Sequence, residues 1–124
     1  MSIQPFIRCK DLSVSLPFYS EILDFKILRA PDPDPESFMS KYSLLERNGD
    51  RVHLSAHSGD GVFGNVVYVQ VENIDTLFEK FLLNGLTESD RGGLTMRPVE
   101  QTWGMKEFAV TDPDGNRITF GHPL

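Results

Sequence analysis

The chain has 124 residues, 40% of them hydrophobic, and a formal net charge of −6, which is the size and composition of one soluble globular domain. No apolar run approaches the ~20 residues of a membrane-spanning helix, the first residues lack the plan of a signal peptide, and the acidic surface disfavours nucleic acid and anionic membranes as partners. We therefore expect a cytoplasmic protein with a single domain over residues 1–124.

The first half of the chain predicts one strand, one helix and three further strands. Residues 3–10 alternate in polarity as a strand does, and Asp11 provides a cap for a helix of about a dozen residues that follows it. Three prolines within residues 31–37 indicate a loop, because proline cannot donate to a sheet ladder. The other strands are expected at 25–30, 38–47 and 51–57, the last two joined by a hairpin turn at Asn48-Gly49.

The same order of elements recurs in the second half. Residues 65–72 alternate as a strand, and an amphipathic helix follows, with Asn73 as its cap and Gly85 as its stop. After a loop through 89–93, the chain predicts a strand at 94–100 and a hairpin over 105–121 that is closed by the turn "DPDG".

The two halves also match residue by residue. Residues 42–55 and 108–121 superpose without a gap at an offset of 66, the separation of Arg51 from Arg117. Chance similarity between two hairpins is the alternative, and the repeated strand and helix upstream argue against it. We therefore predict an α+β fold in which two βαβββ modules, at about 3–57 and 65–122, form curved mixed sheets around a groove with the helices outside.

Two such modules with "DPDGNRI" in the last hairpin resemble the vicinal oxygen chelate superfamily, which includes glyoxalase I, extradiol dioxygenases, fosfomycin-modifying enzymes and bleomycin-binding proteins. Within it, "EQTWGMKEFAVTDPDGNRITFG" is most similar to the bleomycin resistance proteins. The shared pattern is a Trp-Gly pair, then Phe-Ala, then an Asp-Pro-x-Gly-Asn turn. The resemblance covers nearly the whole chain and implies the glyoxalase/bleomycin resistance fold.

Enzymes of this superfamily hold a divalent metal with His, Gln or Glu side chains from four strands. The resemblance places Gln4, His53, Val66 and Thr119 at those four positions. Zinc and iron need three or four His, carboxylate or thiolate ligands, and valine donates nothing. We therefore expect no metal, no other cofactor and no catalytic residue. A glyoxalase-like or dioxygenase-like metal enzyme that uses Gln4 and His53 is the alternative.

Without a metal, the groove implies a binding function. The resemblance implies a homodimer with two clefts at the subunit interface, in which a flat cationic glycopeptide such as bleomycin is sequestered unaltered. Trp103 matches the tryptophan that stacks on the planar part of the drug, and the alternative is that it packs in the core. The predicted ligand-binding residues are Trp103, Gly104, Tyr68, Val66 and His53, with Tyr42 or Phe38 as the opposing ring.

Overall fold

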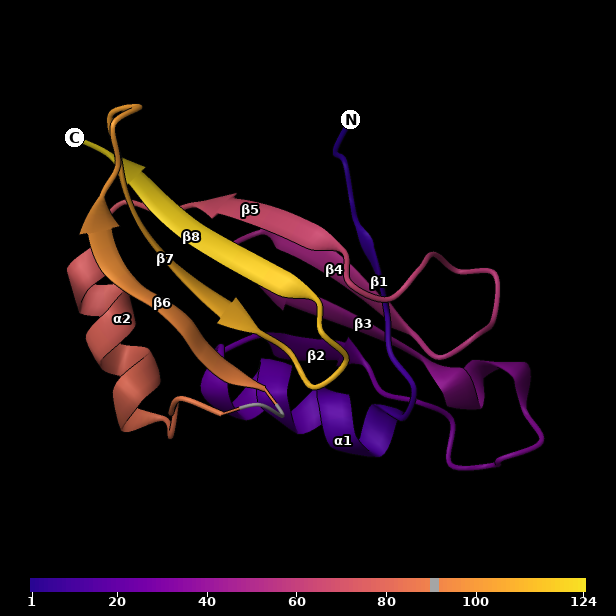
Figure 1. Cartoon of the computed structure of the whole chain (residues 1–124). Coiled ribbons are helices and arrows are strands. Elements are labelled where there is room, and N and C mark those ends of the chain that lie inside the picture. The colour runs from indigo at the N-terminus through magenta and orange to yellow at the C-terminus, as the bar shows by residue number, and fades with distance from the viewer. Residues whose placement is uncertain (90–91) are drawn as a thin grey trace.

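Two four-stranded sheets with one short helix each make up the computed structural model, which describes residues 1–89 and 92–124 (Figure 1). Residues 90 and 91, in the loop expected through 89–93, lie outside the described residues. The first half contains β1 (Phe6–Arg8), α1 (Leu12–Pro17), the π-helical turn η1 (Phe18–Ile22), β2 (Lys26–Arg29), the 3-10 turn η2 (Phe38–Lys41), β3 (Tyr42–Arg47) and β4 (Asp50–Ser55). The second half contains β5 (Val66–Gln70), α2 (Ile74–Leu83), β6 (Gly93–Glu100), β7 (Met105–Thr111) and β8 (Arg117–Pro123).

The two sheets share one topology. The first has the strand order β1-β4-β3-β2 and the second β5-β8-β7-β6. In the first sheet β1 runs parallel to β4, and in the second β5 runs parallel to β8. The register repeats too, because Phe6 faces His53 in the first sheet as Tyr68 faces Thr119 in the second. The predicted α+β fold of two βαβββ units is confirmed.

Both helices begin where the sequence predicts. The Asp11 carboxylate accepts a hydrogen bond from the Ser13 N–H at 2.9 Å, and the Asn73 side chain accepts one from the Thr76 N–H at 3.2 Å. The first helix changes to a π-helical turn directly after Pro17, whose ring nitrogen has no hydrogen to donate. None of the helices among the described residues is long and apolar enough to cross a membrane.

The strand expected at 38–47 is wrong in its first four residues. Residues Phe38–Lys41 form the 3-10 turn η2, and β3 begins only at Tyr42. The Ser37 hydroxyl accepts a hydrogen bond from the Met39 N–H at 3.2 Å, and this local side-chain contact caps the turn. Strand β3 therefore begins four residues later than the polarity pattern predicted.

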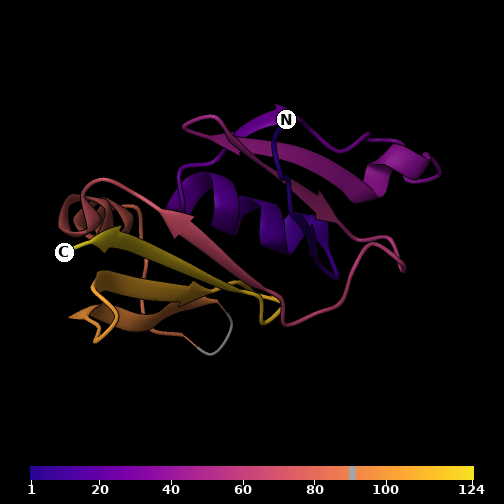
Figure 2. The same ribbon diagram turned by 90° about the horizontal axis from the view of Figure 1, so that it is seen from above.

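Each helix covers one face of its own sheet. Helix α1 contacts β3 and β4, α2 contacts β6, β7 and β8, and Figure 2 shows α1 between the two sheets. We call the opposite, helix-free face of each sheet its outer face. Because side chains alternate along a strand, one set joins the core and the other lies on the outer face. The core set from the two sheets is Ile7, Leu45, Val52, Leu54, Phe108, Val110, Ile118 and Phe120.

The "DPDGN" turn joins the two halves. Buried Tyr19 donates its hydroxyl hydrogen to Asp112 Oδ2 at 2.6 Å, and Asn116 Nδ2 donates to the Arg8 carbonyl at 2.9 Å. Asp112 Oδ1 also accepts from the backbone N–H groups of Asp114 and Asn116. In this chain the turn motif that resembles the family is therefore a buried set of hydrogen bonds that connects the second half to the first.

Candidate ligand-binding site

Trp103 lies on the surface, in the connection between β6 and β7 next to the C-terminus (Figure 1). Its side chain is 63% exposed, so the core alternative does not hold. Its indole Nε1 donates a hydrogen bond to Glu107 Oε2 at 3.2 Å, which fixes one edge of the ring. The neighbouring Gly104 has a φ of 82°, a left-handed backbone conformation that favours glycine in this tight turn.

Tyr68 approaches the same carboxylate from the other side. It projects from β5 on the outer face of the second sheet, and its hydroxyl and the Glu107 side chain lie together against Gly121. Desolvation, with added contributions from the neighbouring Glu107 carboxylate, raises the pKa of Tyr68 to about 12. The hydroxyl therefore keeps its proton at physiological pH, beside the carboxylate.

Glu107 was missed by sequence reasoning. It lies on β7 between Gly121 of β8 and Val99 of β6, and its side chain is only 4% exposed. The signal that could have found it is the alternation along β7, where Phe108 and Val110 face the core and Glu107 faces outward. Two aromatic side chains, both largely exposed, thus share one buried carboxylate.

Val66 extends this surface along β5. It is 67% exposed and lies two residues before Tyr68, so both side chains project from the outer face. Tyr68 also borders a hollow of about 300 Å³ whose other walls include Ile3 and Pro5 of the N-terminal arm. The site is therefore an open, ring-bearing face that the start of the chain approaches from one side.

His53 and Tyr42 lie on the outer face of the first sheet. His53 Nδ1 lies 2.6 Å from the Tyr42 hydroxyl, His53 Nε2 lies 2.8 Å from Gln4 Oε1, and the Phe6 ring stacks on the imidazole at 4.4 Å. Because an amide oxygen only accepts, Nε2 carries the proton and Nδ1 accepts from Tyr42. Desolvation and then the charge of Arg51 lower the pKa of His53, which favours its neutral form.

The single chain does not bring all the predicted residues together. Trp103, Tyr68 and Val66 share the outer face of the second sheet, whereas Tyr42 and His53 share that of the first. Phe38 belongs to neither sheet; it is 73% exposed and stacks on His57 at 4.0 Å. Within one chain these four aromatic and histidine side chains, with Val66, therefore form two separate groups, one on each sheet.

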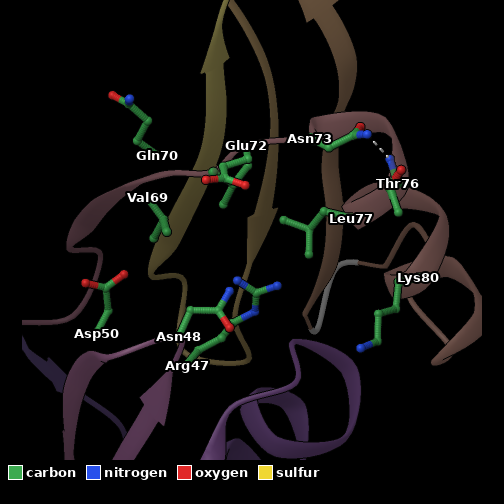
Figure 3. A pocket seen from close by; sticks show the side chains of 11 residues that line it. Arg47, Asn48, Asp50, Val69, Gln70, Glu72, Asn73, Thr76, Leu77 and Lys80 are labelled. Carbon is green, nitrogen blue, oxygen red and sulfur yellow. Dashed lines mark hydrogen bonds between the residues drawn. The ribbon is translucent and has the colours of Figure 1, made fainter.

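A larger hollow of about 560 Å³ lies elsewhere, at the seam between the two halves. Figure 3 shows the Arg47 guanidinium extending into it between Asn48 and Leu77. Burial lowers the pKa of Arg47, while the charges of Asp24 and Asp50 oppose that effect. Because Arg47 and Lys80 share this hollow with Asp50 and Glu72, it favours no single ligand charge. None of the predicted ligand-binding residues lines it.

The four positions that resemble metal-ligand positions do not suit a metal. Gln4 and His53 hydrogen-bond each other on the first sheet, and the second His53 nitrogen is occupied by Tyr42. The second sheet offers Val66, which has no donor atom, and Thr119. Within residues 1–89 and 92–124, no three His, Cys, Asp or Glu side chains are grouped as a metal site requires.

The comparisons with known proteins establish the family. The profile of the Glyoxalase/Bleomycin resistance protein/Dioxygenase superfamily matches residues 3–120, so this chain belongs to that superfamily. No curated protein sequence matches it significantly.

Solved structures share the fold along the whole chain. A bleomycin resistance determinant encoded on transposon Tn5 superposes with a TM-score of 0.76 at 20% identity, over 99% of this chain and 98% of that one. The bleomycin-binding protein of bleomycin-producing Streptomyces verticillus, complexed with copper(II)-bleomycin, gives 0.75 at 21% identity, over 97% and 93%. A bleomycin-binding protein complexed with bleomycin gives 0.77 at 20%, over 100% and 99%.

Proposed function

We propose that this protein is a non-catalytic binding protein that sequesters a flat, cationic small molecule, with bleomycin or a related glycopeptide as the first candidate. The observation that carries the proposal is the pair of exposed rings on a helix-free sheet face, Trp103 hydrogen-bonded to Glu107 and Tyr68 packed against Gly121 beside it. Exposed rings fixed at one edge keep a face free to stack on a planar ligand. The fold shared with bleomycin-binding proteins supports the same choice.

We further propose that the binding unit is a homodimer. Large apolar side chains are exposed on both outer faces of the single chain: Phe6, at 42%, on the first, and Val66 and Trp103, at 67% and 63%, on the second. Ile3 of the N-terminal arm is 93% exposed. Soluble monomers rarely leave such faces open. A twofold arrangement that sets the first sheet of one copy against the second sheet of the other would cover both faces and create two equivalent clefts. Each cleft would then combine His53 and Tyr42 with Trp103 and Tyr68.

Fluorescence tests the binding proposal directly, because Trp103 is the sole tryptophan. Titration with metal-free bleomycin is expected to quench or shift its emission and to saturate at one ligand per cleft. An unchanged spectrum together with no heat in calorimetry would remove bleomycin as the ligand.

The alternative, a metal-dependent lyase or dioxygenase, rests on the enzymes within the matched superfamily and on the side chains of Gln4 and His53 as possible ligands. Metal analysis of protein purified without chelator separates the two functions. Stoichiometric nickel, zinc or iron, with a turnover that disappears when the ion is removed, would establish the enzyme instead.

A further inference from the structure

Glu107 is a buried acid on the outer face of the second sheet, between two exposed rings. Its side chain is 4% exposed, while the Trp103 side chain that bonds to it and the Tyr68 side chain beside it are 63% and 46% exposed. Moving an ionised carboxylate out of water is unfavourable unless hydrogen bonds or a positive charge compensate. The surroundings of this carboxylate therefore indicate what it is for.

Only neutral groups compensate Glu107 in the described part of the chain. The Trp103 indole donates to it, the Tyr68 hydroxyl lies beside it, and none of the four ion pairs among residues 1–89 and 92–124 includes it. The adjacent Lys106 turns to the opposite face of β7 and pairs with Asp75 at 2.9 Å. The Glu107 carboxylate thus lies at the edges of the two rings without a cation beside it.

The neighbouring strand is shaped to keep this arrangement. A Cβ at position 121 would overlap the Tyr68 hydroxyl and press on Glu107 Cγ, so Gly121 leaves the space that the two side chains use. Both rings are therefore held close to the carboxylate while much of their surface stays exposed.

We propose that Glu107 determines the charge of the ligand: its buried carboxylate, held between Tyr68 and Trp103, selects planar aromatic molecules that carry a positive charge over neutral ones of the same shape. This inference rests on the proposed function, because the ligand must stack on those two rings. The charge acts from the edges of the two rings, where burial keeps water from screening it, and we expect a preference of about tenfold.

Two dyes of one shape test the inference. Acridine is neutral at pH 8, and 10-methylacridinium is the same planar ring system with a permanent positive charge. Calorimetry on the unaltered protein is expected to show about tenfold tighter binding of the cation. Glu107→Gln keeps the size of the side chain and removes its charge, so it is expected to weaken the cation to the level of acridine and to leave acridine unchanged.

Two further variants serve as controls. Glu100→Gln removes an exposed charge from β6 of the same sheet and is expected to keep most of the preference, which separates a local effect from the net charge. Glu107→Asp keeps the charge and is expected to keep the preference, which guards against a failure of Glu107→Gln to fold.

Three results would overturn the inference. The first is that Glu107→Gln retains the preference for the cation, and the second is that the unaltered protein binds both dyes equally well. The third is that Glu107→Gln weakens the binding of both dyes equally, because Glu107 would then only position the rings. Parallel titration with metal-free bleomycin shows which proposal has failed. Binding of bleomycin by the unaltered protein, with any of those three results, removes only the role of Glu107. No binding of either dye or of bleomycin removes the proposed function as well.

Discussion

The Tyr68 hydroxyl lies where a Cβ on residue 121 would be, so glycine at this position of β8 leaves the space that the Tyr68 side chain of β5 occupies. The two strands run side by side in parallel, and Tyr68 extends across β8 to reach Glu107 on the next strand, β7. The order of strands in the second sheet therefore brings Tyr68, Gly121 and Glu107 together.

The first prediction follows from this contact. Gly121→Ala is expected to lower the free energy of unfolding by about 1–3 kcal/mol, because the added methyl group displaces Tyr68 within a packed site. It is also expected to weaken ligand binding, since the ring leaves its place beside Glu107. Urea unfolding and calorimetry measure the two effects. In the double variant Tyr68→Ala/Gly121→Ala the steric cost of the methyl group should disappear; an additive loss of stability would contradict the assigned contact.

Trp103 is expected to matter for both binding and stability. Its side chain is 63% exposed, but Trp103→Ala removes a hydrogen-bond donor from the buried Glu107 carboxylate and should lower the free energy of unfolding by about 1–3 kcal/mol. Loss of one stacked ring should weaken the ligand by about 0.5–1.5 kcal/mol or more. Leu83→Ala, at an 89% exposed position on α2, is the control and should alter neither quantity. Unchanged affinity in Trp103→Ala would remove this ring from the site.

The dimer can be tested with two valines of equal exposure. Val62 in the loop before β5 and Val66 on the outer face of the second sheet are both 67% exposed. Val66→Asp is expected to shift the protein to a monomer, because an unpaired charge at the centre of an interface is costly. Val62→Asp should leave the assembly unchanged. Analytical ultracentrifugation measures both, and a monomeric unaltered protein would refute the proposed interface.

Stability is expected to fall when His53 becomes protonated. Because the pKa of folded His53 is lowered, mainly by desolvation, the unfolded chain binds this proton more readily. The contribution of neutral His53 is complete above the unfolded pKa of about 6.5 and is lost as the pH falls through the lower folded pKa.

His53→Gln should therefore flatten the decline in stability between about pH 7 and pH 5, measured by urea unfolding at a series of pH values. His57→Gln is the matched control, because His57 stacks on Phe38 outside the Gln4 and Tyr42 contacts. An equal effect of both substitutions would show that the hydrogen bonds of His53 are not the cause.

The local features of this fold follow directly from the amino-acid sequence, because each depends on contacts between residues a few positions apart. The caps at Asp11 and Asn73, the positive φ values at Asn48 and Gly49 in the first hairpin, and the repeated order of elements are all present as predicted. The wrong strand prediction at Phe38–Lys41 also concerns a local feature. Ser37 is a cap residue that could have been recognised in the sequence, but the alternation of polarity favoured a strand there.

Which side chains meet depends on how the strands assemble into sheets. Trp103 was singled out from the sequence, yet its position on the surface and its bond to Glu107 depend on how the β6–β7 connection folds back over the sheet. Tyr68 and Glu107 are brought together by the insertion of β8 between β5 and β7. A polarity pattern states which face of a strand a residue occupies, but strand order and register determine its neighbours, because those depend on pairings between distant segments.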